Sequence, residues 1–221
     1  MVVNDLIKVL ENKTFASSEL VRKILNNKDA RHLFISEYKY FNDDDNLNLY
    51  ELFIEEKIIL KNIYLLSETI ELAININNIK SYNFIKDKLL TKNHYLVKIS
   101  CLDYINHFYN KRCIQQDEYL NLNNQIKKCS SNKIVKFQVY INLLIFKKEV
   151  YFRVILKFLN NNKEPFYLYR IVTSFLNYES FSFVFKEKKI LNEIINLINS
   201  NKIINSKDKF NLIELICTAR A

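Results

Sequence analysis

The chain contains no glycine. Average usage would supply roughly 15 in a protein of this length. Glycine reaches positive φ without steric cost and lets a backbone approach a ligand closely. Its absence excludes a glycine-rich phosphate loop, a dinucleotide-binding fingerprint and a nucleophile elbow of the G-x-S-x-G type. Tight Asn-Gly hairpin turns are excluded as well. We therefore expect helices joined by short turns, and a function carried by side chains on a surface.

Long apolar runs and a secretory leader are also missing. The N-terminal sequence Met-Val-Val-Asn-Asp-Leu has no basic region followed by an apolar one. No apolar run approaches the ~18 residues that a bilayer-spanning helix needs. The longest candidate, around Ile171 to Phe185, is interrupted by Asn177, Glu179 and several serines. We expect a cytoplasmic protein that does not contact a membrane.

Cysteine and histidine are few and show no metal-binding spacing. The four cysteines form no C-x-x-C pair, and none has zinc-ligand spacing with a histidine. We expect buried, reduced thiols that behave as small hydrophobic side chains, and hence a reducing compartment. The sequence predicts no metal site and no cofactor. The residues concerned are Cys101, Cys113, Cys129, Cys217, His32, His94 and His107.

A nucleophilic pair is the nearest approach to an enzymatic motif. His94 and Cys101 are seven residues apart, about two helical turns, so they would share a helix face. A Cys-His nucleophile also requires a group that orients the base and donors for an oxyanion. The sequence supplies neither pattern, and we expect a protein that is not an enzyme.

Helical periodicity runs through almost the whole chain. Leu6, Val9 and Leu10 show the i, i+3, i+4 pattern, and later segments repeat it without sustained alternation of period two. Asparagine pairs or triplets separate the periodic segments, at positions 26–27, 77–78, 123–124 and 160–162. Asparagine both caps helix starts and tolerates the left-handed conformation at helix ends. The predicted N-caps are Ser18, Ser81, Asn93, Asp117, Asn132 and Ser206, and Pro165 is placed in a first helical turn. This pattern predicts an all-α protein of about ten to twelve helices.

Three segments share one shape: a polar break, followed by an apolar helix with a basic residue one turn in. They contain Val97-Lys98, Val135-Lys136 and Tyr169-Arg170, and the basic residues are separated by 38 and 34 positions. Two-helix repeats have periods of this size. Over residues 81–185 the pattern resembles HEAT and armadillo-like helical repeats, whose second helix commonly opens with Val-Arg or Val-Lys. The resemblance implies an α-solenoid of antiparallel helix pairs, with an irregular helical bundle as the alternative.

A single domain over residues 1–221 is expected, with less regular helices in 1–80 and a repeat-like, basic part in 81–221.

HEAT-like DNA glycosylases form a family of similar length. They use tryptophans around a catalytic aspartate. Because this chain has no tryptophan, that activity is disfavoured.

Charge is segregated along the chain, which carries a formal net charge of +9. Residues 37–71 hold nine acidic side chains against three lysines, a net charge of −6. Such asymmetry is informative about partners. It suggests a docking patch for a basic partner, although acids near a helix N-terminus also complement the helix dipole. The predicted patch consists of Asp43, Asp44, Asp45, Glu51, Glu55 and Glu56.

The C-terminal part is basic, with 17 basic and 7 acidic side chains in residues 121–221. A basic face with nearby aromatics is the pattern of a protein that follows a nucleic acid backbone and stacks on bases. We take as candidate site residues Lys133, Lys136, Arg153, Arg170, Lys188 and Lys189. Other basic residues of this face are Lys127, Lys128, Lys157 and Lys186, and the candidate stacking rings are Phe137, Tyr140, Tyr151, Tyr167 and Tyr169. The alternative is that Lys98, Lys136 and Arg170 hold the basic position that the repeats use structurally.

The size, helical pattern and acidic segment make the chain similar to bacterial immunity proteins, which neutralise secreted toxins. This similarity implies that the chain sterically blocks a cognate toxin, which we expect to be a nuclease. The chain is then expected to be a monomer or to form a one-to-one complex with the toxin. Two alternatives remain open: an α-solenoid that binds RNA or single-stranded DNA through its basic face, and a general protein-interaction scaffold.

Overall fold

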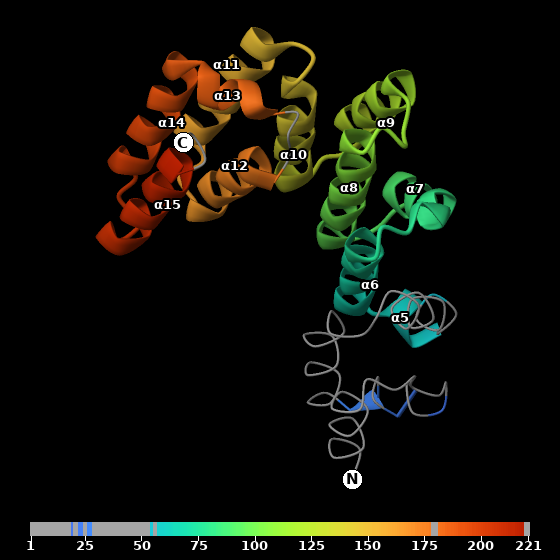
Figure 1. Ribbon diagram of the computed structural model, residues 1–221. Coiled ribbons are helices and arrows are strands. Elements are labelled where there is room, and N and C mark those ends of the chain that lie inside the picture. The colour runs from blue at the N-terminus through green and yellow to red at the C-terminus, as the bar shows by residue number, and fades with distance from the viewer. Residues whose placement is uncertain are drawn as a thin grey trace. The chain divides into compact units, whose positions relative to one another are not determined.

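A computed structural model describes residues 57–177 and 181–218, together with Glu19, Arg22, Lys23, Asn26, Asn27 and Ile54 nearer the N-terminus (Figure 1). The regular structure of these residues is helical, with no strand among them, so the all-α prediction is confirmed for the described chain. None of the helices described is long and apolar enough to cross a membrane. The chain divides into two compact units, Met1–Tyr104 and Ile105–Ala221, with the division inside one helix, α8 (Tyr95–Asn110).

The first unit contains α5 (Lys57–Lys61), α6 (Ile63–Asn75), the 3-10 turn η2 (Ile79–Ser81), α7 (Tyr82–Leu90) and the first part of α8. Leu65, Leu66 and Ile70 bury the inner face of α6. Helices α6 and α8 are joined by a 2.6 Å hydrogen bond between the hydroxyls of Ser67 and Ser100. The buried Tyr104 hydroxyl donates to the backbone oxygen of Asn78 and so fixes the turn after α6.

The second unit continues with α9 (Gln116–Cys129), α10 (Lys133–Leu144), α11 (Lys148–Asn161), α12 (Pro165–Asn177), α13 (Ser182–Lys186), α14 (Lys188–Ser200) and α15 (Ser206–Thr218). Helix α10 is central, because it packs against α9, α11 and α12 (Figure 1). Helix α14 contacts α11, α13 and α15, and α15 also contacts α12. Four sequential pairs of the described helices in this unit pack side by side, namely α9 with α10, α10 with α11, α13 with α14 and α14 with α15, which is the usual outcome of short connections.

Large apolar side chains hold the second unit together. Phe137 on α10 stacks on Phe158 of α11, with ring centres 4.7 Å apart, and both rings meet Tyr167 of α12 edge-on. Burying each such ring stabilises the fold by roughly 1.5–3 kcal/mol. Because Phe137 and Tyr167 are core residues, they are not available to stack on a ligand. That part of the predicted set of stacking rings is therefore wrong.

At two helix ends, an asparagine and an arginine adopt the left-handed backbone conformation that glycine usually adopts there. Asn77 follows α6 with φ 52°, while the Asn78 N–H donates to the oxygen of Ala73 and the Asn77 N–H to that of Ile74. This pair of bonds is a Schellman motif, which needs a left-handed residue. The same motif ends α8, where Arg112 has φ 60°. The sequence predicted asparagine in this role, but not arginine.

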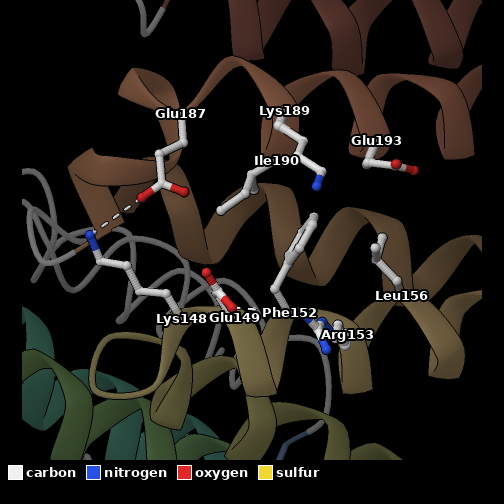
Figure 2. Close-up of a pocket in the computed structure, with 9 residues that line it drawn as sticks. All are labelled: Lys148, Glu149, Phe152, Arg153, Leu156, Glu187, Lys189, Ile190 and Glu193. Atoms are coloured by element: carbon white, nitrogen blue, oxygen red, sulfur yellow. Dashed lines mark hydrogen bonds and ion pairs between the residues drawn. The ribbon is translucent and has the colours of Figure 1, made fainter.

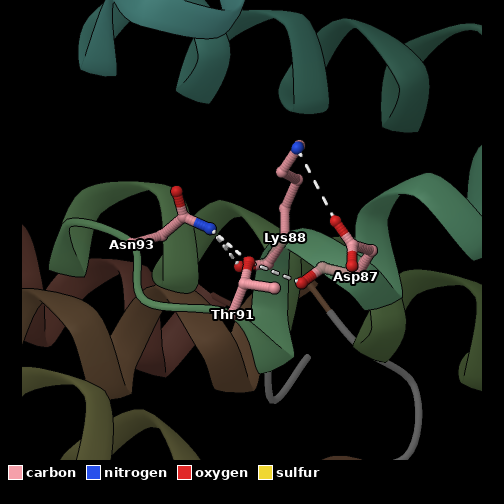
Figure 3. Close-up of polar contacts among 4 residues, drawn as sticks. All are labelled: Asp87, Lys88, Thr91 and Asn93. Carbon is pink, nitrogen blue, oxygen red and sulfur yellow. Dashed lines mark hydrogen bonds and ion pairs between the residues drawn. The ribbon is translucent and has the colours of Figure 1, made fainter.

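Several predicted caps need correction. Asn132 caps α10 as expected, accepting from the N–H groups of Ile134 and Val135, and Pro165 is the first residue of α12. The Asn93 amide instead donates to the backbone oxygen of Lys88, so it closes the end of α7 rather than opening α8 (Figure 3). Asn205, not Ser206, caps α15, accepting from the Asp208 N–H.

One further predicted cap and one predicted break also differ. Asp117 lies inside α9, whereas Ser81 holds the predicted N-cap position of α7, without a side-chain cap bond. The predicted break at residues 123–124 is wrong, because both asparagines are in the middle of α9. Ser18 lies outside the described residues.

Candidate functional site

The six acidic residues of the predicted docking patch lie outside the described residues. They are Asp43, Asp44, Asp45, Glu51, Glu55 and Glu56. Their place in the fold therefore stays a prediction from the sequence. The six predicted basic residues, in contrast, all lie in the second unit.

The structure distributes these basic residues over three places. Lys133 and Lys136 lie on α10, the first exposed and the second half-buried. Arg153 of α11 and Lys189 of α14 line one cavity, and Lys188 is exposed beside Lys189. Arg170 of α12 is half-buried and bonded to α10. The predicted set is therefore not one continuous cluster.

Arg170 ends a chain of buried amides. Its Nε donates to Oε1 of Gln138 at 2.6 Å, and Nε2 of Gln138 donates to Oδ1 of Asn142 at 2.8 Å. Nδ2 of Asn142 donates in turn to Oδ1 of Asn123 on α9 at 3.1 Å. Gln138, Asn142 and Asn123 are each 0% exposed. A buried amide that loses its partner costs about 1–3 kcal/mol, so this network fixes α9, α10 and α12 against one another.

The network reaches α8 through a tyrosine. The Asn123 amide donates to the backbone oxygen of Tyr119, and the Tyr119 hydroxyl donates to Oδ1 of Asn106 at 2.8 Å. The Tyr119 ring stacks on that of Tyr109, with centres 4.1 Å apart. These contacts show why Asn123 is accommodated inside a helix: its amide donates to the backbone oxygen one turn earlier in α9, and its Oδ1 accepts from Asn142 of α10.

A cavity of about 320 Å³ lies between α11 and α14 (Figure 2). Its apolar part is formed by Phe152, Leu156 and Ile190, and the side chains of Phe152 and Ile190 lie between the two helices. Its rim holds equal numbers of acidic and basic side chains, namely Lys148, Arg153, Lys189, Glu149, Glu187 and Glu193. The site therefore combines an apolar surface with an electrically balanced edge.

Two ion pairs order part of this rim. Lys148 Nζ lies 3.5 Å from a carboxylate oxygen of Glu187 and 4.0 Å from the centre of the Phe183 ring. Arg153 and Glu149 approach to 3.7 Å one turn apart on α11, but both side chains are more than 80% exposed. Exposed pairs of this kind contribute little to stability. Sequence patterns gave no sign of the cavity, because its two walls are about 40 residues apart in the chain.

A second surface crosses α9, α10 and the start of α11. We call it the Lys–Tyr surface, and it consists of Lys127, Lys136, Tyr140, Lys147 and Tyr151. Lys127 Nζ donates to the Tyr151 hydroxyl at 3.2 Å and lies 5.6 Å from that ring's centre. The Tyr140 and Tyr151 rings are nearly parallel, 28° apart, with centres separated by 6.3 Å. Tyr140 and Tyr151 are both half-buried residues.

The positions of the lysines follow from helix spacing. Lys136 is four residues before Tyr140 on α10, so this pair shares a helix face, and Lys147 is the residue that precedes α11, which carries Tyr151. The sequence had suggested Lys127, Lys136, Tyr140 and Tyr151 as part of a broad basic face. It had not suggested Lys147, and it offered no means of bringing Lys127 to Tyr151.

His94 and Cys101, the pair that the sequence offered as a nucleophile and base, lie in different surroundings. Cys101 is fully buried, and burial raises the pKa of its thiol well above the usual range, so the reactive thiolate is suppressed. His94 is exposed and its Nδ1 accepts from the Leu96 N–H. Burial, with Lys111 nearby, lowers the pKa of His107. Within the described part of the chain, no group of three or more His, Cys, Asp and Glu side chains is arranged to hold a metal.

Exposure of the remaining cysteines corrects a prediction. Cys113, Cys129 and Cys217 are exposed, so only Cys101 is the buried thiol that was expected.

Comparison with protein-family models, with curated proteins and with solved structures finds no match.

Proposed function

We propose that this chain is a binding protein that acts as an immunity protein, covering the active site or substrate groove of a bacterial toxin. No chemistry by the chain itself is part of the proposal. We also propose a HEAT-like stack of helix pairs as its architecture. Support comes from α8, α10 and α12, which begin at Tyr95, Lys133 and Pro165, each after a short polar break, as in a two-helix repeat.

The observation that carries the proposal is the segregation of charge. Residues 37–71 have a net charge of −6 in a chain of net charge +9. A nuclease toxin presents a basic surface to its nucleic acid substrate, and a concentrated acidic segment is complementary to such a surface. Attraction of this kind speeds encounter and disfavours partners of the wrong charge.

The cavity between α11 and α14 supplies a described surface with the properties of a protein contact. Affinity in protein complexes is concentrated in apolar or aromatic side chains that fill pockets surrounded by polar groups. Phe152, Leu156 and Ile190 offer the apolar part of such a pocket, and the balanced rim offers opposite charges to a partner's polar edge. In this proposal the acidic segment raises the rate of association with the toxin, and the cavity provides the affinity.

The proposal requires a cognate toxin, and its test begins with any toxin domain that is found encoded next to the gene for this chain. Co-expression is expected to restore growth to cells producing the toxin, and the purified proteins are expected to form a one-to-one complex. The variant Glu51→Lys/Glu55→Lys should lose at least 10-fold in association rate. Its matched control is Glu164→Lys/Glu214→Lys, an equal change of charge at exposed residues of the second unit. Equal effects of the two variants would contradict a specific role for the acidic segment.

A separate variant tests the cavity. Leu156→Asp places a charge on its apolar part, and we expect a loss of more than 10-fold in toxin affinity, mainly through faster dissociation. Circular dichroism of the variant checks that its helices are retained. Unchanged affinity in a folded Leu156→Asp protein would remove the cavity from the interface.

A further inference from the structure

We propose that the Lys–Tyr surface binds single-stranded nucleic acid without sequence preference. This proposal is independent of toxin binding, since it involves none of the acidic residues of 37–71 and none of the cavity residues. It concerns Lys127, Lys136, Tyr140, Lys147 and Tyr151, all in the second unit.

The first argument is the arrangement of the rings. Tyr140 and Tyr151 come from neighbouring helices and present two nearly parallel rings, 28° apart. Nucleobases stack on aromatic side chains irrespective of sequence, because every base has a flat π face. Lys127 is bonded to the Tyr151 hydroxyl at 3.2 Å, so its ammonium group is held beside the ring. A nucleotide bound there would meet a stacking partner and a cation together.

The second argument is the charge of the surrounding chain. Residues 119–148 contain no aspartate or glutamate, and they carry Lys127, Lys128, Lys133, Lys136, Lys147 and Lys148. Of these, Lys148 pairs with Glu187. The other five form no ion pair with any residue that the structure describes. Lysines without acidic partners are suited to phosphates, whose neutralisation releases counterions and drives binding.

The third argument distinguishes between polyanions. Duplex DNA or RNA keeps its base faces stacked inside the helix, so the rings of Tyr140 and Tyr151 would gain nothing from it. An acidic protein would use the lysines but not the stacking rings. The combination of both features favours a single strand whose bases are accessible.

The experiment measures fluorescence anisotropy of labelled 15-residue probes of oligo(U) and oligo(dT), and of a duplex of equal length, with the full chain at 50 to 200 mM salt. We expect both single strands to bind at least 10-fold more tightly than the duplex. If the five lysines without an acidic partner each neutralise a phosphate, log K falls with log salt with a slope of about −3.5. No detectable binding of either single strand at 50 mM salt would overturn the proposal.

Two variants of equal charge locate the binding surface. Lys127→Gln/Lys136→Gln/Lys147→Gln should weaken oligo(U) binding at least 10-fold and flatten the salt slope by about 2. The control Lys163→Gln/Lys202→Gln/Lys207→Gln removes three exposed lysines from other segments of the second unit, and should weaken binding no more than 3-fold. Equal losses would show attraction by net charge alone and would overturn the assignment.

A third variant separates stacking from charge. Tyr151→Leu keeps every lysine, and we expect a 5- to 100-fold loss of oligo(U) affinity with the salt slope unchanged, which is the effect of losing one stacked base. Tyr169→Leu, at an exposed tyrosine of α12, is the control and should leave affinity unchanged. Circular dichroism shows whether both proteins remain folded. A folded Tyr151→Leu variant that binds as tightly as the wild type would overturn the proposal, and would leave a lysine surface for an acidic protein.

Discussion

The guanidinium of Arg170 donates through Nε to Oε1 of Gln138 at 2.6 Å, which joins α12 to a fully buried amide on α10. The same glutamine donates to Asn142, and Asn142 donates to Asn123 on α9. One half-exposed arginine thus terminates a polar chain through the middle of the second unit. The bond gives a structural reason for a basic residue at this position in the helix.

Removing the amide at position 138 should destabilise the second unit strongly. Gln138→Met leaves Arg170 Nε and Asn142 Oδ1 without these partners, and we expect the free energy of unfolding to fall by about 2–4 kcal/mol. Urea unfolding followed by circular dichroism measures this loss.

A double-mutant cycle with Arg170→Met isolates the contact itself, since Arg170 makes other interactions too. The expected coupling between the two positions is about 1.5–3 kcal/mol, the range for a hydrogen bond to a charged group. Strictly additive losses would mean that the contact contributes nothing to folding.

Arg112 should be a position where glycine stabilises the chain. Its φ of 60° brings the β-carbon of an L-residue close to its own carbonyl, at a cost of about 1 kcal/mol. We expect Arg112→Gly to raise the free energy of unfolding by up to ~1 kcal/mol, net of the added entropy of the unfolded chain. Thermal unfolding compares it with Arg112→Ala, which removes the side chain without relieving the strain. Asn77→Gly should gain less, because asparagine tolerates this conformation.

In the native protein, three of the four cysteines should react with a thiol reagent and one should not. Cys113, Cys129 and Cys217 are exposed, while Cys101 is buried with a raised pKa. In native protein at pH 8, a chromogenic disulfide reagent is expected to modify three thiols quickly and the fourth only on unfolding. A Cys101→Ala variant should show the same three reactive thiols and no fourth. Rapid modification of all four in native protein would contradict the packing around α8.

Stability should depend on pH through His107. Its folded-state pKa lies below the ordinary value of 6.5, owing first to burial and then to Lys111. As pH falls below about 6.5, the unfolded chain therefore takes up this proton before the folded chain does, and the free energy of unfolding decreases. Above about pH 6.5 the contribution of neutral His107 to the free energy of unfolding is fully present. Urea unfolding between pH 5.5 and 7.5 should show a smaller slope in His107→Asn than in the wild type.

Local chemistry in the sequence predicted much of the fold. Apolar spacing predicted an all-helical chain, Asn132 and Pro165 marked the starts of α10 and α12, and asparagine was expected where Asn77 ends α6. Each of these depends on residues within one helical turn. The sequence around them therefore contains the necessary information.

Features that depend on distant residues were not predictable in this way. Asn123 looked like a helix break, but it is satisfied by Asn142, 19 residues away, within a network that only the folded chain creates. The Lys127–Tyr151 contact crosses two helix connections, and the cavity joins α11 to α14. A basic face was evident from composition, yet the structure divides its members between a polar network, a cavity rim and the Lys–Tyr surface.

The central claim is that the chain presents binding surfaces already formed on its helices and steered by charge. Stopped-flow association with the toxin domain that the proposal requires tests this claim most directly. A preformed surface predicts an observed rate that rises linearly with toxin concentration, and electrostatic steering predicts a rate constant that falls as salt increases. An observed rate that reaches a plateau at high toxin concentration, or that is the same at all salt concentrations, would contradict the account.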